Sequence, residues 1–342
     1  MIVRPFAAAA VLLGLPASPA FAASFDCSKA ATPFERAICD TPALSAADEL
    51  LAKAFATATG GLTKESVVAM RADQRNWLDY AQAVCTDDAK PLTSGSYDET
   101  ASACIAEQFR SRSTTLEQSR MLGGHRFYLQ SNYGALPDPN EADNPDSYWK
   151  VASHETVLPL LDADDPLAEG FNAYTLGLGE GLSDGDEGEF DASADSEVSM
   201  VVKEVAGTSR ITLEVSSYWY GHGAAHGNWG VSYRHYYIPE AREVIAGDIF
   251  NGDDWASVLT DAAWEQLQAQ HKEWLDVDSA GDIAEIVADP TRWSFSDDYG
   301  LVIQFQPYEI AAYAYGAPTV TIPWEKLDAI KAETQESVRF GY

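Results

Sequence analysis

The cysteines and histidines of this chain are candidates for catalysis, disulfide formation or metal binding, and they are unevenly distributed. The cysteines are Cys27, Cys39, Cys85 and Cys104, and none occurs in the remaining two thirds of the chain. All six histidines come later, from His125 onward. A thiol becomes a strong nucleophile when a neighbouring group lowers its pKa. Cysteines without a histidine in the same segment therefore predict structural disulfides rather than catalysis.

Two of the histidines have a spacing that metal sites use. His222 and His226 are four residues apart, which would put two ligands on one face of a helix, and zinc is the metal that such a pair binds. Glycines surround them at Gly221, Gly223 and Gly227, and no glutamate lies between them. We therefore expect a hydrogen-bonded turn with glycines at unusual backbone angles. A hydrolase built on the two histidines and a carboxylate is the least favoured function.

An acidic run is the other candidate for a metal site. Carboxylates alternate along it, at Asp184, Asp186, Glu187, Glu189 and Asp191. Oxygen ligands of this kind suit calcium, but the spacing is not that of a complete EF-hand loop. We expect a solvated acidic loop, and hence no metal, no cofactor and no catalytic residue in the chain.

The amino-terminal residues are organised like an export signal. Arg4 precedes an apolar run over residues 7–15, and residues 20–22 (Ala-Phe-Ala) form a small-x-small cleavage site. We expect residues 1–23 to be a cleaved signal peptide and the mature protein to be periplasmic or secreted. No later stretch approaches the roughly 20 apolar residues that a membrane span requires. In an oxidising compartment an even number of cysteines predicts disulfides, whereas four cysteines in the cytosol more often bind metal.

The chain is strongly acidic. It has 53 Asp and Glu against 22 Lys and Arg, a formal net charge of −31, which becomes −32 when residues 1–23 and their single Arg4 are removed. Such a surface repels nucleic acid and anionic lipid, favours basic partners and also keeps a protein soluble. We expect no nucleic-acid partner and no integral membrane segment. The hydrophobic fraction of 46% predicts a folded chain, and its length predicts two domains.

Residues 24–122 have the periodicity of helices. Thr32 provides an N-cap, Pro33 follows at the first helical position, and Glu35 adds an acid to the first turn. Apolar residues then recur at helical spacing, and a Gly60-Gly61 turn separates two long runs of them. The predicted helices cover about residues 33–39, 45–59, 63–85 and 101–122.

Four cysteines allow three disulfide pairings, and the sequence does not choose among them. Folding the two long helices back on each other about the glycine turn places Cys85 opposite Cys39. The local alternative joins Cys27 to Cys39 and Cys85 to Cys104 across short loops. Of these arrangements we favour the local pairing.

Residues of this module also resemble a known family. The features that carry the resemblance are Phe25-Asp26-Cys27, Ile38-Cys39, Leu44-Ser45 with Asp48 and Leu51, Gln74 with Trp77, and Cys85 followed by Cys104. Together they resemble the LprI-type lysozyme-inhibitor domain over nearly the whole module. One departure is the loop over residues 86–103, which is longer than the loop usual in that family. The resemblance implies a domain that acts on lysozyme by binding.

From about Gly124 the pattern changes to strands. Runs rich in β-branched and aromatic residues predict strands over residues 197–205, 210–220, 230–238, 300–306 and 318–322. An amphipathic helix is predicted over residues 254–275 and a closing helix over residues 324–332. The predicted fold class is α+β, with a disulfide-bonded helical module over residues 24–122 and an α+β domain over residues 123–342. In the second domain we expect meandering antiparallel strands packed by helices.

Two segments of the larger domain carry a second resemblance. They are residues 218–227 (Tyr-Trp-Tyr-Gly-His-Gly-Ala-Ala-His-Gly) with residues 247–250 downstream, and residues 301–316. These segments resemble the RsiV-type extracytoplasmic domain, a likeness that runs from about Ser147 to Ala332. The RsiV member is a lysozyme receptor, and related domains accompany some polysaccharide deacetylases, whose separate catalytic domain this chain lacks. The resemblance therefore implies a binding domain and not an enzyme.

Aromatic residues concentrate around the first of these segments. Successive residues of a strand point to opposite faces, so Tyr218 and Tyr220 share one face and Trp219 takes the other. We expect one set to be core and the other to form an exposed platform for a protein partner or a sugar. The partner-binding residues that we predict are Tyr220, His222, His226, Trp229 and Tyr308.

These features together predict an exported envelope protein that binds and inhibits lysozyme or a similar basic muramidase. Both resemblances are to families tied to lysozyme, and the acidity suits a cationic partner. The alternative is a peptidoglycan- or glycan-binding module that uses the same aromatic residues without inhibitory activity. Charge separates the two hypotheses, because peptidoglycan offers no strongly cationic surface.

Overall fold

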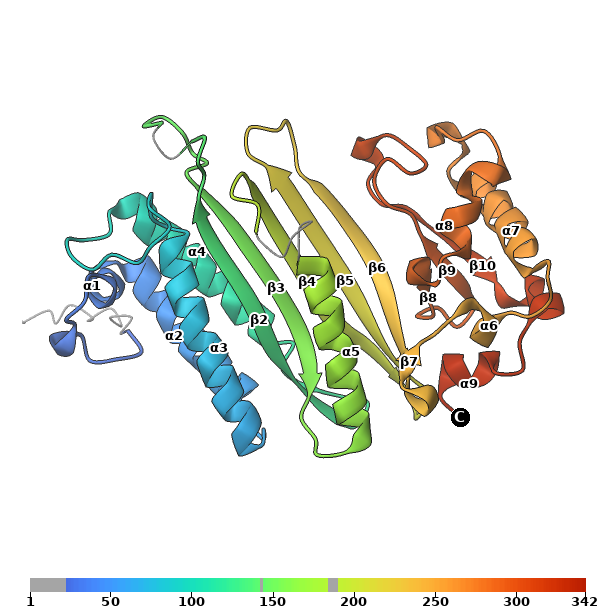
Figure 1. Cartoon of the computed structure of the whole chain (residues 1–342), viewed down its shortest axis with the longest axis horizontal. Coiled ribbons are helices and arrows are strands. Elements are labelled where there is room, and N and C mark those ends of the chain that lie inside the picture. The colour runs from blue at the N-terminus through green and yellow to red at the C-terminus, as the bar shows by residue number, and fades with distance from the viewer. Residues whose placement is uncertain (1–22, 142–143, 184–189) are drawn as a thin grey trace, which may run out of the picture.

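The computed structural model describes residues 23–141, 144–183 and 190–342 (Figure 1). The predicted signal peptide therefore lies almost entirely outside the described residues, as do all but one of the carboxylates of the acidic run. None of the helices that are described is long and apolar enough to cross a membrane.

The first part of the described chain consists of four α-helices. Thr32 and Glu35 form a reciprocal capping box ahead of the first helix, and Thr63 accepts a backbone N–H group ahead of the third. Thr41 separates the first two helices, because Pro42 has no N–H group with which to continue the hydrogen bonding of the first. The helices are α1 (Pro33–Asp40), α2 (Pro42–Ala58), α3 (Lys64–Ala83) and α4 (Glu99–Leu116).

Both disulfides close local loops, as the favoured pairing predicts. Cys27 is bonded to Cys39 and Cys85 to Cys104, each pair with 5.7 Å between its Cα atoms. Cys39 does not face Cys85, because it lies on the separate short helix α1 and not on the long helix α2. The backbone of α2 also runs closest to α4 and not to α3, so the predicted pairing of the two long helices is not the closest contact in the module.

A seven-stranded sheet forms the centre of the molecule (Figure 1). Its strands lie in chain order, and every neighbouring pair is antiparallel except β3 and β4. Helix α5 (Pro166–Ser183) connects these two parallel strands and packs on β3. The α+β class is confirmed, whereas the parallel pair and its connecting helix depart from the predicted antiparallel meander. The strands are β1 (Met121–Leu122), β2 (His125–Pro137), β3 (Val151–Leu161), β4 (Ala194–Ala206), β5 (Arg210–Gly221), β6 (Asn228–Tyr237) and β7 (Arg242–Glu243).

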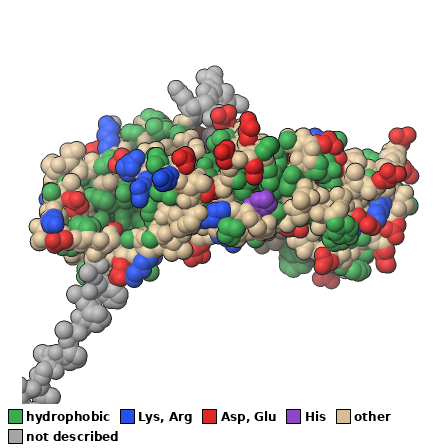
Figure 2. Space-filling view, turned by 90° about the horizontal axis from the view of Figure 1, so that it is seen from below, with side chains coloured by type: hydrophobic (Ala, Val, Ile, Leu, Met, Phe, Trp, Pro, Cys, Tyr) green, Lys and Arg blue, Asp and Glu red, His purple; other side chains and the backbone are tan. Residues whose placement is uncertain are grey.

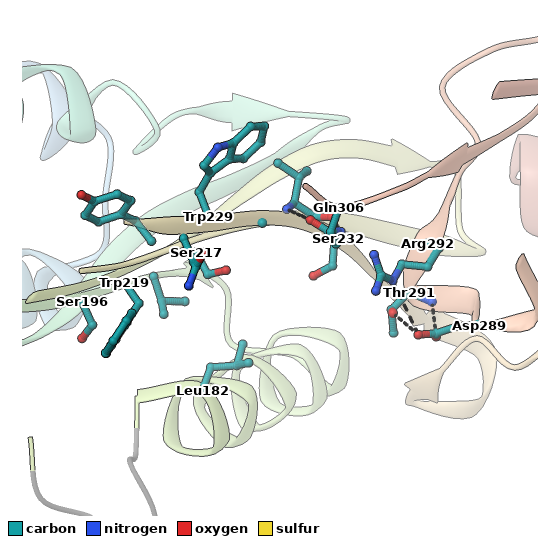
Figure 3. A pocket seen from close by; sticks show the side chains of 15 residues that line it. Leu182, Ser196, Ser217, Trp219, Trp229, Ser232, Asp289, Thr291, Arg292 and Gln306 are labelled. Atoms are coloured by element: carbon teal, nitrogen blue, oxygen red, sulfur yellow. Dashed lines mark hydrogen bonds and ion pairs between the residues drawn. The ribbon is translucent and has the colours of Figure 1, made fainter. Parts of the chain in front are cut away.

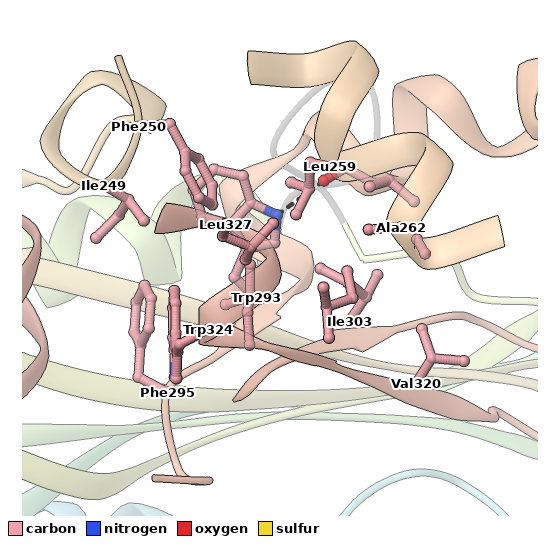
Figure 4. Packing of buried hydrophobic residues seen from close by; sticks show 14 of the residues in the cluster. Ile249, Phe250, Leu259, Ala262, Trp293, Phe295, Ile303, Val320, Trp324 and Leu327 are labelled. Carbon is pink, nitrogen blue, oxygen red and sulfur yellow. Dashed lines mark hydrogen bonds between the residues drawn. The ribbon is translucent and has the colours of Figure 1, made fainter. Parts of the chain in front are cut away.

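The rest of the chain folds around a three-stranded antiparallel sheet in the order β10-β9-β8. Trp293 is fully buried in its apolar cluster, edge-on to Phe250 and beside Leu259 (Figure 4), and its indole N–H donates to the carbonyl of Val287 at 2.8 Å. The predicted closing helix over residues 324–332 is instead two short 3₁₀ turns. The strands are β8 (Trp293–Ser294), β9 (Gly300–Gln304) and β10 (Thr319–Pro323), and the α-helices are α6 (Ala246–Ile249), α7 (Trp255–Gln270), α8 (Ala284–Ala288) and α9 (Gln335–Phe340).

A buried ionic contact joins the helical module to the large sheet. Arg112 on α4 donates to the carboxylate of Asp73 on α3, and both side chains are buried. Asp73 also accepts the backbone N–H of Ser131 on β2 at 2.9 Å, and β2 is the strand on which α3 packs. Because a buried charge is tolerated only when it is paired, these three groups fix where the module sits on the sheet.

Candidate binding site

Three loops meet at one end of the large sheet, at the top of Figure 1. They are the loop between β2 and β3, the turn between β5 and β6, and the loop between β9 and β10. The β5–β6 turn touches both of the others, through His222 on one side and His226 on the other. The two histidines that the sequence singles out therefore lie in a turn, and they fasten it to its neighbours.

His222 holds the turn from the inside. Its side chain is buried, and its Nδ1 donates to Asp138 Oδ2 at 2.6 Å, which ties the turn to the β2–β3 loop. Its Nε2 lies 3.6 Å from a carboxylate oxygen of Asp195 on β4. Burial by itself would raise the pKa of Asp138, but the hydrogen bonds from His222 and from the backbone of Asn140 outweigh it and lower that pKa. An ionised Asp138 beside His222 is thus part of the scaffold beneath the surface.

His226 holds the turn from the outside. Its Nδ1 donates to the carbonyl of Gly227 at 3.0 Å, and its Nε2 lies 3.2 Å from the hydroxyl of Tyr308. Its ring stacks on Tyr313 with 4.3 Å between the centroids, and the Tyr313 hydroxyl donates to the same Gly227 carbonyl at 2.7 Å. Tyr308 and Tyr313 belong to the β9–β10 loop, so His226 brings residues some 80 positions apart into one cluster.

The tip of the β5–β6 hairpin exposes aromatic rings on both faces. Tyr218 and Trp229 are direct cross-strand partners on one face, and they are 42% and 39% exposed. Trp219 on the opposite face is 45% exposed. The expectation that one set is core is therefore wrong. The buried apolar residues of β5 are Ile211, Leu213 and Val215, in the first half of the strand. There α5 and the carboxy-terminal part cover the sheet.

Further rings extend this exposed tip in both directions. Trp149, which precedes β3, lies 6.5 Å from Tyr220, and Tyr308 lies 5.1 Å from Tyr313. Trp274, which follows α7, stacks on Tyr315 at 5.2 Å. We call this row the aromatic edge, and its members are Trp149, Tyr218, Tyr220, His226, Trp229, Trp274, Tyr308, Tyr313 and Tyr315.

Gly227 links rings from two parts of the row. The Tyr218 ring lies over Gly227, where a Cβ atom would come within 2.6 Å of it, and the Tyr313 hydroxyl donates to the Gly227 carbonyl at 2.7 Å. Burial raises the pKa of Tyr218, and Asp195, Tyr220 and Tyr313 raise it further. Rings and polar tips combined in this way are typical of surfaces that bind proteins or sugars.

The predicted binding residues fall into two groups. Tyr308, at 59% exposure, and Trp229 present their rings to solvent, His226 is exposed within the turn, and Tyr220 is half-buried at the end of β5. His222 is buried. The sequence gives no sign that Trp149 or Trp274 belongs to the same surface, because each comes from a loop distant in the chain. For the β9–β10 loop the signal in the sequence is the resemblance carried by residues 301–316, which include Tyr308, Tyr313 and Tyr315.

Charge is divided unequally along the chain. Residues 24–122 contain 14 acids and 10 bases, whereas residues 123–342 contain 39 acids and 11 bases. The first part therefore has a formal charge of −4 and the second −28. In Figure 2, lysine and arginine side chains gather over the helical part on the left, and acidic side chains predominate over the centre and right.

His222 meets Asp138 and Asp195, whereas His226 makes its contacts elsewhere, with Tyr308 and Tyr313. Over the described ranges of the chain, no group of three or more His, Cys, Asp or Glu side chains is placed to hold a metal ion. His222 and His226 point into different contacts on opposite sides of the turn. The two histidines therefore do not share a ligand position.

Family comparisons agree with the two resemblances seen in the sequence. Residues 27–116 match the family model "Lysozyme inhibitor LprI", and residues 247–325 match DUF3298, described as a protein of unknown function. DUF3298 is the carboxy-terminal domain of RsiV-type proteins. Two separate parts of the chain therefore match two different families. The second match includes Tyr308, whereas the β5–β6 turn lies outside both matches.

Comparison with individual proteins gives only distant likenesses. A DUF3298 family member from Bacteroides fragilis has a TM-score of 0.47 at 17% identity, covering 64% of this chain and 97% of its own. A DUF3298 family protein from Pseudomonas aeruginosa has a TM-score of 0.40 at 16% identity, covering 64% and 98%. No curated protein matches the sequence.

The two domains define the class of protein in general terms. An LprI domain indicates lysozyme inhibition, and neither LprI nor DUF3298 is a catalytic family. The two disulfides and the LprI domain fit an extracytoplasmic protein.

Proposed function

We propose that this protein binds a basic lysozyme or a similar muramidase outside the cytoplasm and blocks it, with the aromatic edge as the contact surface. The observation that carries the proposal is the exposure of this row of rings beside an LprI domain. Tyrosine and tryptophan concentrate binding energy at protein interfaces, because their large rings combine apolar area with a polar group. No catalytic residue is needed for inhibition of this kind.

Long-range attraction and short-range contact come from different groups in this proposal. The acids of residues 123–342 draw in a cationic enzyme and speed its encounter. The exposed rings of Tyr308 and Trp229 then lose solvent in the complex and hold it together. Tyr220 and His226 support these rings, and His222 acts as a positioning residue because it is buried against Asp138.

The edge also provides a reason for the two domains to occur in one chain. Trp149 lies at its end next to the helical module, and the neighbouring Lys150 pairs with Asp87 of that module at 2.7 Å. Asp87 belongs to the loop between Cys85 and Cys104, the loop that is longer than usual for the family. A partner seated on the edge would therefore reach the LprI domain at one end and the DUF3298 domain, through Tyr308, at the other.

The test is the binding of hen lysozyme by wild-type protein and by two single variants. Tyr308→Ala removes an exposed ring of the edge, and we expect faster dissociation with a loss of about 2–4 kcal/mol in binding free energy. Tyr299→Ala is the matched control, because Tyr299 is similarly exposed, at 65% against 59%, but lies just before β9, at the other end of that strand from the β9–β10 loop. Equal binding by wild type and Tyr308→Ala, or equal losses of affinity in the two variants, would show that the aromatic edge is not the contact surface.

A further inference from the structure

A cleft lies at the tip of the β5–β6 hairpin, and both Trp219 and the pair Tyr218 and Trp229 are among its lining residues (Figure 3). Its volume is about 510 Å³, and it opens between the end of α5, marked by Leu182, and the short turn over residues 289–292 of the carboxy-terminal part. In Figure 3 the side chains of Trp219, Ser196 and Leu182 lie on one side of the sheet, while the ring of Trp229 points to the other side. The volume is within the range of small-ligand sites, about 300–1,000 Å³.

The floor of the cleft is made of small and hydroxylated residues. Ser217 on β5 and Ser232 on β6 flank Gly230, which has no side chain. A Cβ atom at Gly230 would come within 2.9 Å of the Gln306 carboxamide and 3.4 Å of the Ser217 hydroxyl, so glycine keeps this part of the floor open. Among the residues that the structure describes, the side chains of Ser217, Ser232 and Asn228 have no hydrogen-bond partner. They are free to donate to a ligand or accept from one.

One wall of the cleft is a fixed indole. The ring of Trp219 lies along its own strand over Gly221, where a Cβ atom would come within 2.8 Å of it. The ring is therefore held against backbone, yet it remains 45% exposed. An indole with one side supported and the other open provides a flat apolar platform at little cost in side-chain entropy.

The opposite wall has charged residues that are already neutralised. The Arg292 guanidinium donates to both carboxylate oxygens of Glu309, at 2.6 and 3.2 Å, and lies 3.9 Å from Asp289. The Gln306 carboxamide makes two hydrogen bonds with the backbone of Val231, at 2.5 and 2.8 Å. No net positive charge is left to hold an anion such as a phosphate or a carboxylate.

We propose that this cleft binds a neutral saccharide segment, with Trp219 as the stacking platform. The C–H groups on one face of a pyranose ring form an apolar surface that suits an indole, while its hydroxyl groups need small polar partners, here Ser217, Ser232 and Asn228. An anionic ligand would be disfavoured, because residues 123–342 carry a formal charge of −28 and the one arginine of the lining is already paired. Tyr218 and Trp229 of the aromatic edge also line the cleft, but the residues proposed to hold the saccharide, Trp219, Ser217, Ser232 and Asn228, are not members of the edge.

The experiment is calorimetric titration of the oxidised protein with two neutral trisaccharides, tri-N-acetylchitotriose and cellotriose. We expect saturable binding of at least one of them, with a Kd of about 0.1–1 mM. Trp219→Ala should raise the Kd for the trisaccharide at least about tenfold, because the stacking platform is lost. Ser217→Phe should raise the Kd by a similar factor, because the larger side chain fills the floor of the cleft. The second variant guards against a folding defect in the first.

Tyr308→Ala is the control that separates this site from the proposed lysozyme surface. It should bind the trisaccharide like wild type while losing lysozyme, and Trp219→Ala should show the reverse. Binding of either trisaccharide supports a saccharide site. A difference in affinity between the two shows whether the site recognises the acetamido group. No saturable binding of either up to about 10 mM, or unchanged binding by Trp219→Ala and Ser217→Phe, would overturn the inference.

Discussion

The helical module and the rest of the chain differ in how they are held together and in the charge that they carry. The module contains all four cysteines, joined in two disulfides, and its formal charge is only −4. Residues 123–342 contain no cysteine, carry −28, and are organised around two further apolar clusters, one of them centred on Trp293. A small module buries too little surface to be stable without cross-links, whereas the larger part does not need them.

The difference also separates the family match from the charge. The match to a lysozyme-inhibitor family lies in the nearly balanced module, while the charge that would attract a basic enzyme lies in the other part. Acidity therefore is not a property of the inhibitor domain itself. The aromatic edge begins at Trp149 beside the module and ends at Trp274, so it is the element that connects the two regions at their surface.

The largest effect is expected where the two regions are joined. Arg112→Ala leaves Asp73 buried without its charged partner, and the free energy of unfolding should fall by about 3–5 kcal/mol. Arg110→Ala on the same helix removes an exposed pair with Glu107 and should cost about 0–1 kcal/mol. Urea denaturation of both variants measures the difference, and similar losses would mean that the buried pair does not secure the joint.

Reduction of the disulfides should distinguish the two regions directly. Each bridge is expected to contribute about 2–4 kcal/mol, so reduced protein should lose protection from hydrogen exchange in residues 24–120 while the carboxy-terminal cluster stays protected. The oxidised protein should contain no free thiol in denaturant. Uniform loss of protection along the chain would contradict the division into a cross-linked and an uncross-linked region.

The aromatic edge and the acidic surface should affect different rate constants. Replacing Tyr220 and Trp229 together with alanine should raise the dissociation rate of a lysozyme complex, at a cost of about 2–4 kcal/mol. Neutralising the exposed Asp261 and Glu285, which lie away from the edge, should instead slow association slightly. Surface plasmon resonance separates the two rates, and circular dichroism checks that the double alanine variant folds. A slower association in the alanine variant with unchanged dissociation would refute the assignment.

A smaller, pH-dependent effect is expected at the same joint. Burial raises the pKa of Glu155 on β3 to about 7, with Glu197 and Asp73 adding to the shift and Arg112 opposing it. The folded state then holds a proton that the unfolded state releases above about 4.5. Stability should therefore fall as pH rises from about 5 to about 8, by about 1–3 kcal/mol. Thermal unfolding of Glu155→Gln should lack this part of the pH dependence, and an unchanged dependence would exclude Glu155 as its source.

Local signals in the sequence predict the helical module well. Thr32, Pro33 and Thr63 determine where two helices begin through contacts within a few residues, and the structure has those starts. The strands over residues 210–220 and 230–238 are confirmed for the same reason, because β-branched and aromatic residues persist over their full length.

Features that depend on distant residues were not predictable in this way. Helix α5 contains several glycines in an acidic stretch, so its sequence alone is a weak helix signal, and its formation depends on packing Phe171 against Phe127. The aromatic edge is a stronger case, since Trp149 and Trp274 join it only through the tertiary fold. For the same reason the sequence identifies His222 as a candidate residue but does not show that its side chain is buried and hydrogen-bonded to Asp138.

The most direct test of the central claim is inhibition of hen lysozyme by the oxidised, mature protein at increasing salt. We predict clear inhibition at low ionic strength, with an association rate that falls as salt rises, because at about 0.15 M the attraction between charges is screened beyond roughly 8 Å. Dissociation should change less, since the rings of the edge are close contacts. Absence of any binding or inhibition at low salt would contradict the account and leave a glycan as the leading ligand.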